Sequence, residues 1–169
     1  HLGSQQTVAG EPLSRLGLNI TQASLTHAHQ YLDTLVGQLH RHAVEAQRLV
    51  LEIPAALAGQ CPEETARFAT LVREAGCALA LERLDGNASS LLAELRPDYV
   101  KISLKTLADA YGLEAGCNLA QALCGMAAAL SIRTIASEVE DELFREALPD
   151  YGFDYAQGLV IGAPAALSR

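Results

Sequence analysis

Several polar side chains in this chain of 169 residues could take part in chemistry, because each lies at or near the carboxyl end of an apolar run that could form a strand. Glu82 and Arg83 are neighbours at the end of one such run. The others are Asn19, Glu52, Lys101, Ser137 and Gln157. In a (β/α)8 barrel the carboxyl ends of the strands converge on one pocket. The placement therefore predicts a single site with carboxylates, a lysine and amides, which is either an active site or the remnant of one.

Six short apolar runs supply the strands that would position these groups. They cover residues 16–20, 49–53, 78–84, 99–103, 134–139 and 155–160. Most are nearly continuous in hydrophobic residues, as expected for parallel strands covered on both faces. Helical patterns lie between them: residues 62–76 begin with Pro62 and two glutamates, end at Gly76 and carry one apolar face. Similar stripes occur within residues 32–39 and 119–130, and a short helix starts at Asp141.

The alternation of strands and helices predicts a parallel sheet, either a barrel or an open doubly wound sheet. Periodicity alone does not choose between these two folds. However, no Gly-rich phosphate loop follows any of the apolar runs, and this weighs against the open sheets that bind nucleotides.

The composition narrows the class of protein. Half of the residues are hydrophobic, which suits one globular domain with its own core. Because the net charge is −8, the surface repels phosphate backbones; we expect no nucleic-acid binding, although a small phosphate ligand could enter a local pocket. No apolar run approaches the ~20 residues of a membrane span, and no signal peptide is visible. We expect a cytoplasmic chain without direct membrane insertion, which a longer parent protein could still tether to a membrane.

Six motifs along nearly the whole chain resemble those of the EAL domain family, the bacterial phosphodiesterase fold that cleaves cyclic di-GMP. Residues 18–21 are similar to the family's "sxNlS" strand, residues 49–55 to its "lvlEitE" strand and residues 79–91 to its "aLDDFGtGyssL" segment. Residues 97–103, 135–140 and 154–164 then resemble "Pdyv-KiD", "iAEGVE" and "d-aQGy-fg-P". The resemblance implies an EAL-type (β/α)8 TIM-like barrel, with about six of its eight strands in this chain.

Active members of this family hold two Mg²⁺ or Mn²⁺ ions with carboxylates and place a lysine near the attacking water. The resemblance implies that the remnant of the ligand site consists of Asn19, Glu52, Glu82, Arg83, Lys101, Glu140, Gln157 and Pro164. However, the family's paired aspartates are Glu82 and Arg83 here, and the glutamate of "AEG" is Ser137. Arg83 puts a permanent cation where a divalent metal would bind. We therefore expect the Mg²⁺/Mn²⁺ site to be lost, with no cofactor, no catalytic residue and no enzyme activity.

The family's Glu-Ala-Leu strand and its following arginine precede the asparagine strand, and this chain shows no such segment. We expect residues 1–15 to be a tag remnant, a linker or a poorly ordered lead-in, and residues 16–169 to be the C-terminal three-quarters of a degenerate EAL domain. Six strands would leave sheet edges and apolar surface exposed. Either the chain is part of a longer protein, which we favour, or another segment or subunit covers the gap.

The resemblance implies a catalytically inactive regulatory module that binds cyclic di-GMP in its complete form and relays the signal to a partner protein. One alternative is a ligand-free module for protein interaction or homodimer formation. Another is a weak metal-dependent phosphodiesterase that uses Glu52 and Glu82. Two questions stay open: whether Glu52 and Lys101 bind a ligand or only each other, and whether Arg83 pairs internally, which we favour, or contacts a phosphate.

Overall fold

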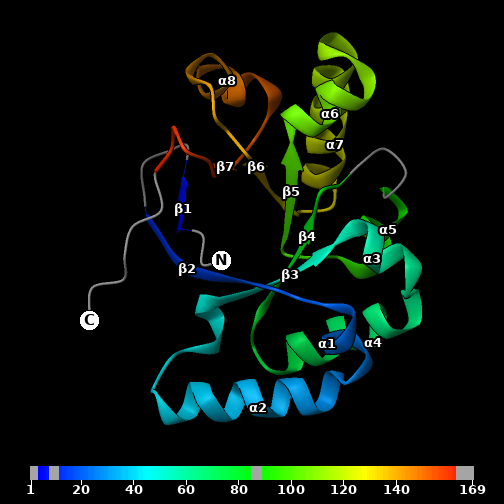
Figure 1. Ribbon diagram of the computed structural model, residues 1–169, viewed down its shortest axis with the longest axis vertical. Helices are drawn as coiled ribbons and strands as arrows, with labels where there is room; N and C mark the ends of the chain where they lie inside the picture. The colour runs from blue at the N-terminus through cyan, green and yellow to red at the C-terminus, as the bar shows by residue number, and fades with distance from the viewer. Residues whose placement is uncertain (1–3, 8–11, 85–88, 163–169) are drawn as a thin grey trace.

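The computed structural model describes residues 4–7, 12–84 and 89–162 (Figure 1). Hydrogen bonds between neighbouring strands join its strands into a closed barrel. In order around the ring these are β1 (Ser4–Thr7), β2 (Pro12–Asn19), β3 (Leu49–Pro54), β4 (Ala78–Glu82), β5 (Tyr99–Ser103), β6 (Arg133–Ser137) and β7 (Tyr155–Ala156). Each strand from β2 to β7 pairs with the next one in parallel. The six predicted parallel strands are therefore confirmed, and the fold is the TIM-like barrel that the sequence indicated.

The additional strand β1 corrects two of the expectations. It pairs antiparallel with β2 on one side and with β7 on the other, so the expected open sheet edges are wrong. It also lies, together with the start of β2 at Pro12, inside the segment that we expected to precede the fold. The apolar pattern gave no sign of β1, because this short strand is polar in sequence and its pairing is made by backbone groups.

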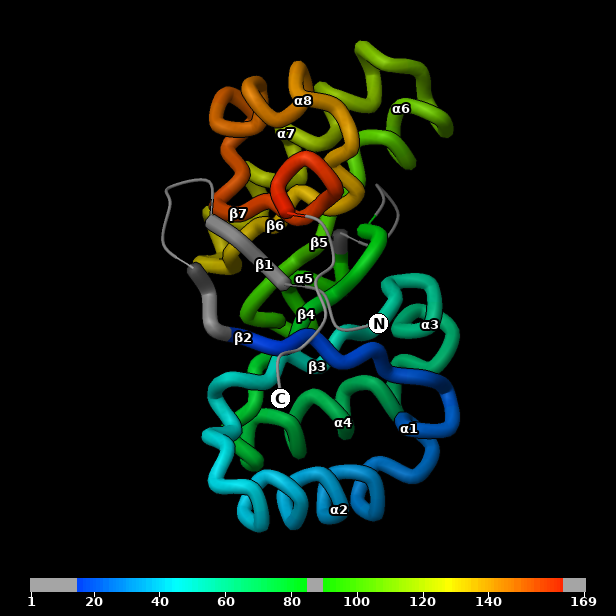
Figure 2. Tube along the Cα trace, turned by 60° about the vertical axis from the view of Figure 1, so that its left-hand side comes forward, coloured from blue at the N-terminus to red at the C-terminus, as the bar shows by residue number. Residues whose placement is uncertain are grey.

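Helices lie between the strands and cover the ring. They are α1 (Gln22–Thr26), α2 (Ala28–Arg41), α3 (Ala55–Gln60), α4 (Pro62–Glu74), α5 (Ser89–Leu95), α6 (Leu104–Tyr111), α7 (Leu113–Ala129) and α8 (Glu142–Ala147), with 3₁₀ turns η1 (Ala46–Arg48) and η2 (Leu148–Tyr151). Their ends follow local chemistry: Ser103 and Asp141 cap α6 and α8, and Pro62 opens α4. Figures 1 and 2 show α1, α2 and α4 at one end of the molecule and α6, α7 and α8 at the other.

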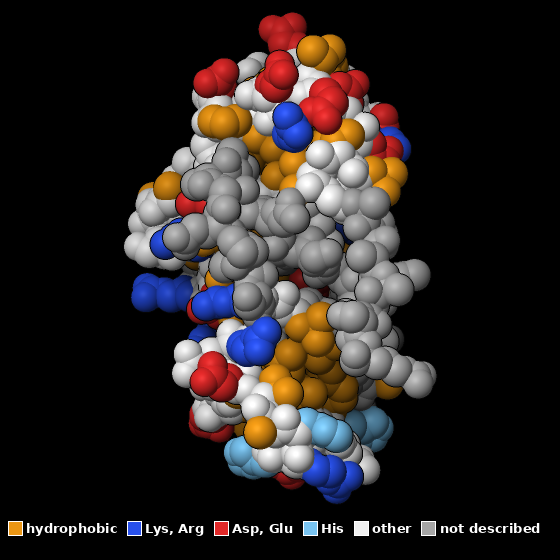
Figure 3. All heavy atoms as spheres, turned by 90° about the vertical axis from the view of Figure 1, so that its left-hand side faces the viewer, with side chains coloured by type: hydrophobic (Ala, Val, Ile, Leu, Met, Phe, Trp, Pro, Cys, Tyr) orange, Lys and Arg blue, Asp and Glu red, His pale blue; other side chains and the backbone are white. Residues whose placement is uncertain are grey.

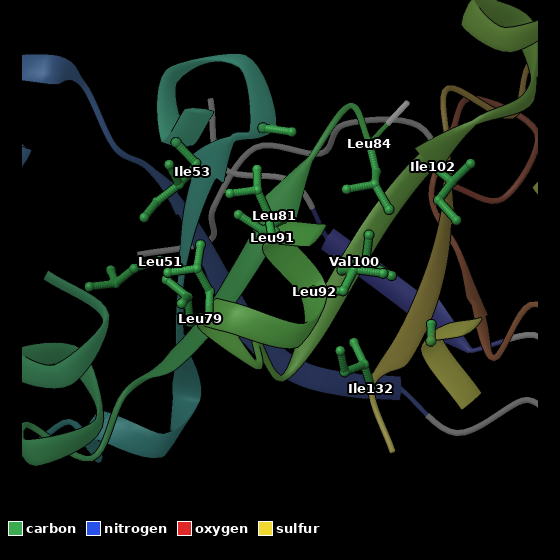
Figure 4. Close-up of a cluster of buried hydrophobic side chains, with 14 of the residues drawn as sticks. Leu51, Ile53, Leu79, Leu81, Leu84, Leu91, Leu92, Val100, Ile102 and Ile132 are labelled. Atoms are coloured by element: carbon green, nitrogen blue, oxygen red, sulfur yellow. The ribbon is translucent and has the colours of Figure 1, made fainter. Parts of the chain in front are cut away.

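The alternation of side chains along the strands separates two apolar layers. One layer fills the space between strands and helices, with Leu51, Leu79, Leu81 and Ile102 fully or almost fully buried (Figure 4). The other lies inside the ring and consists of Val50, Ala78, Ala80, Tyr99 and Ile135, with Tyr155 packed against them. Because the interior positions are every second residue, Glu52 and Lys101 belong to the inside of the barrel.

The amino-terminal end of the ring is closed by a repeated Asp-Tyr pair. Asp98 and Asp154 each accept a hydrogen bond at 2.8 Å from a backbone N–H of the preceding strand, at Leu79 and Thr134 respectively. The rings of Tyr99 and Tyr155 follow, with centroids 6.1 Å apart, and the Arg15 guanidinium lies over the Tyr99 ring. Hydrogen bonds and aromatic contacts fill the amino-terminal end of the barrel, and in folds of this type the site lies at the opposite end, where the strands have their carboxyl ends. Within the described residues, no helix is both long and apolar enough to cross a membrane.

Candidate functional site

Three neighbouring strands bring two glutamates and one lysine together near their carboxyl ends. The Lys101 ammonium on β5 donates to Glu52 Oε2 on β3 at 2.6 Å and lies 3.4 Å from Glu82 Oε1 at the end of β4. Glu52 and Lys101 are only 4% and 5% exposed, whereas Glu82 is half-buried. These three side chains, called the buried triad below, confirm that the polar strand ends converge, and they place a cation between two carboxylates.

The triad fits because the neighbouring strand β2 carries a glycine, Gly17, next to the Glu52 carboxylate. A Cβ atom added to Gly17 would lie 2.2 Å from Glu52 Oε1 and 2.8 Å from Glu52 Cδ, so the carboxylate occupies the space that a side chain would need. We did not single out Gly17 from the sequence. The signal was present, since a glycine inside an apolar strand often marks a close approach of a neighbouring group.

Burial raises the pKa of Glu52 from its ordinary 4.5 to about 7. The charge of Lys101 acts in the opposite direction, and a hydrogen bond with Glu82 adds to the increase, but burial has the largest effect. Near neutral pH Glu52 therefore exchanges a proton, and above it the triad carries two negative charges and one positive charge.

This pKa predicts a pH-dependent contribution to stability. Between about pH 4.5 and 7 the folded chain holds a proton on Glu52 that the unfolded chain has released. The stabilisation is complete below pH 4.5 and is lost as the pH rises through 7, with a total change on the order of 3 kcal/mol. Urea denaturation of the wild type and of Glu52→Gln across pH 4.5 to 8 isolates this contribution, because the other groups are common to both. We expect the variant to gain stability relative to the wild type as the pH rises. Parallel curves would contradict the raised pKa.

Asn19 and Gln157 lie at the same edge of the ring as the triad. Asn19 is exposed at the end of β2 and pairs in register with Glu52. Gln157 is half-buried, and its backbone joins the strand end to the next loop: its N–H donates to Ala136 O at 2.8 Å and its carbonyl accepts from Val139 N at 3.1 Å. Both residues therefore lie at the strand ends that form the mouth of the barrel.

Glu140 lies away from the triad. It is exposed in the loop after β6, and its carboxylate pairs with Lys105 of α6 at 3.3 Å. In the same loop Glu138 adopts a left-handed backbone with φ 58° and accepts a hydrogen bond from the Thr106 hydroxyl at 3.4 Å. These contacts hold the loop against the start of α6. The remaining predicted position, Pro164, lies outside the described residues.

Arg83 does not make the internal ion pair that we favoured from the sequence. Its side chain is exposed and forms no hydrogen bond or ion pair with any residue that the structure describes. Its backbone has a φ of 53°, in the left-handed region. The physical reason is that Lys101 already lies between Glu52 and Glu82, so the expected partners of Arg83 have their cation from another strand.

The donor set does not fit a pair of divalent cations. Hard cations such as Mg²⁺ and Mn²⁺ bind several oxygen ligands each. Across residues 4–7, 12–84 and 89–162, no group of three or more His, Cys, Asp or Glu side chains is arranged to hold a metal ion. Two carboxylates are present in the triad, and an ammonium group is bound to both of them.

Comparison with known proteins identifies relatives in sequence. The model of a family described as the EAL domain matches residues 3–164. The protein "Cyclic di-GMP phosphodiesterase PdeF" of Escherichia coli strain K12 is 25% identical in an alignment of 159 positions that covers 92% of this chain and 21% of PdeF. The chain therefore spans about a fifth of the length of this relative.

Solved structures show the same fold. Vibrio cholerae LapD S helix-GGDEF-EAL bound to c-di-GMP is 27% identical, with a TM-score of 0.74 over 88% of this chain and 36% of that one. The Xanthomonas citri FimX EAL domain in complex with c-diGMP is 23% identical, with a TM-score of 0.80 over 90% of this chain and 61% of that one.

Proposed function

This chain belongs to the EAL domain family, and from that premise we propose that it is a catalytically inactive EAL domain that binds cyclic di-GMP and relays its presence to a partner protein. In this proposal polar side chains at the barrel mouth bind the dinucleotide, and the pair of metal ions needed for hydrolysis is not bound. Binding would then change the state of the domain without consuming the ligand.

The observation that carries the loss of activity is Arg83, which stands at the position of the second of the family's paired aspartates. Active members also keep a lysine at the position of Lys101, so that lysine does not by itself prevent metal binding. The change at Arg83 removes one carboxylate and places a permanent cation next to Glu82, which already interacts with Lys101 at 3.4 Å. A divalent ion there would meet this additional cation, which makes metal binding unfavourable.

The relatives support the choice of ligand. PdeF is described as a cyclic di-GMP phosphodiesterase, and the LapD and FimX structures contain c-di-GMP. Asn19, Glu52, Lys101 and Gln157 stand at family positions around the mouth of this barrel. A dinucleotide bound there would meet side-chain amides and an ammonium group.

A partner protein is the second part of the proposal, and exposed apolar side chains support it. Leu113 and Leu143 are 61% and 76% exposed, and Tyr111 and Leu159 also reach the surface. On the face shown in Figure 3, apolar side chains lie at the surface near the end that carries α8 and again beside the histidines at the other end. A domain that only contacts proteins would use the same surfaces, and ligand binding distinguishes the two functions.

Calorimetric titration of cyclic di-GMP into this chain, once in EDTA and once in Mg²⁺, tests the proposal. We expect a saturable binding isotherm with the same affinity in both buffers. Absence of binding in both would leave protein interaction as the function, and binding only with Mg²⁺ would contradict the loss of the metal site.

A further inference from the structure

We propose that Arg83 binds a phosphate group of the dinucleotide and supplies the positive charge that metal ions supply in active relatives. This inference rests on the proposed function, because it requires cyclic di-GMP to bind at the barrel mouth. It concerns a side chain at the position of a family aspartate, where this chain has reversed the charge.

Contacts with Lys101 hold both neighbours of Arg83, Glu82 and Leu84, in place, and these contacts limit the position of the Arg83 side chain. On one side Glu82 interacts with Lys101 at 3.4 Å. On the other side the Leu84 side chain is 2% exposed, and its N–H donates to the Lys101 carbonyl at 3.3 Å. The chain therefore passes from one anchored residue to the next through a left-handed turn at Arg83, and the guanidinium is presented to solvent at the carboxyl edge of the sheet.

Neither packing nor pairing explains an arginine at this position. A left-handed backbone is unfavourable for any residue with a Cβ atom, and glycine would remove the strain. The side chain is exposed and makes no hydrogen bond or ion pair with the described residues.

The net charge of the groups at the barrel mouth explains how the Arg83 guanidinium could help to bind a phosphate. When both glutamates are ionised, the buried triad has a net charge of −1 and would repel a phosphodiester. Arg83 brings the total to zero, and its planar donor groups can bind two phosphate oxygens at once. Of the two described cations at the ends of β4 and β5, Lys101 is held by the glutamates and Arg83 is available to a phosphate.

Arg83→Gln tests this assignment, with Arg96→Gln as the matched control. Arg96 is also exposed and also left-handed, with φ 43°, but it precedes β5 at the opposite end of the barrel. In calorimetric titrations with cyclic di-GMP in EDTA, we expect Arg83→Gln to weaken binding by about tenfold to a hundredfold. Arg96→Gln should bind like the wild type.

A third variant, Arg83→Gly, separates binding from stability. Glycine suits the left-handed backbone, so its melting temperature should equal that of the wild type or exceed it by about 2 °C. Its affinity for cyclic di-GMP should nevertheless fall as far as that of Arg83→Gln. A structural role for Arg83 would instead lower the melting temperature of both variants.

Each result decides between specific claims. Wild-type binding together with unchanged affinity in Arg83→Gln overturns the role of Arg83 and leaves the proposed function standing. Equal weakening in Arg83→Gln and Arg96→Gln also overturns it, because a general change in charge would then be the cause. If the wild type binds no cyclic di-GMP in EDTA or in Mg²⁺, the proposed function fails, and this inference fails with it.

Discussion

Replacement of Lys101 with methionine is expected to lower the free energy of unfolding by about 3–5 kcal/mol at pH 8, because it leaves two carboxylates without their shared cation inside the barrel. Glu52 and Lys101 are each almost fully buried, so water cannot take over the role of the ammonium group. Methionine keeps much of the volume of the lysine stem, and the loss therefore reports charge rather than packing. Urea denaturation of the wild type and of Lys101→Met measures this change in the free energy of unfolding.

Lys105→Met is the matched control. Lys105 also pairs with a glutamate, Glu140, at 3.3 Å, but the two side chains are 60% and 52% exposed. Exposed ion pairs contribute little, and we expect a change below about 0.5 kcal/mol. The effect of Lys101→Met should shrink as the pH falls through 7, since Glu52 then holds a proton. Similar losses in the two variants at pH 8 would show that the buried triad has no special importance for stability.

Alanine at Gly158 is expected to destabilise the chain by about 3 kcal/mol or more. An added Cβ atom would lie 2.1 Å from the Val139 carbonyl oxygen and 2.4 Å from the Val139 nitrogen. These are backbone atoms, and hydrogen bonds from Val139 N to Gln157 O and from Val160 N to Val139 O hold them in place. The overlap can be relieved only by moving the loop after β6 away from the end of β7, at the mouth of the barrel.

Gly125→Ala provides the comparison for this variant. Gly125 lies within α7, and a Cβ atom there would meet nothing within 4 Å. Alanine is a better helix former than glycine, so the control should be more stable than the wild type by about 0.5–1 kcal/mol. Thermal denaturation should show a lower melting temperature for Gly158→Ala and a higher one for Gly125→Ala, each compared with the wild type. A melting temperature of Gly158→Ala close to that of the wild type would contradict the close contact with Val139.

The parallel strands could be predicted because their physical cause is visible in the sequence. A strand covered on both faces needs an apolar run, and the run at residues 99–103 matches β5 in both of its bounds. The run at residues 155–160 overestimated β7, which ends at Ala156, because apolar residues also cover the turn that follows. The polar strand β1 left no such signal, since its place depends on backbone groups of β2 and β7.

Site residues on the strands could likewise be predicted from the sequence, whereas site residues in the loops could not. Glu52 and Lys101 were predicted to converge because they lie near the carboxyl ends of strands, which meet at one pocket in a barrel. Residues after the strand ends were not predictable in this way: Arg83 and Glu140 take positions set by loop hydrogen bonds and by competition for partners. The favoured pairing of Arg83 failed because Lys101 on the neighbouring strand β5 already interacts with Glu52 and Glu82, at 2.6 Å and 3.4 Å.

An assay of cyclic di-GMP hydrolysis shows whether the chain is an enzyme. The wild-type chain is incubated with the dinucleotide in Mg²⁺ and in Mn²⁺, and the nucleotides are separated by chromatography, with active PdeF as the positive control for the assay. We expect cyclic di-GMP to be recovered intact in both buffers. A linear dinucleotide that accumulates in proportion to the amount of this chain and disappears in EDTA would contradict it, because the buried triad would then have to hold a catalytic metal ion.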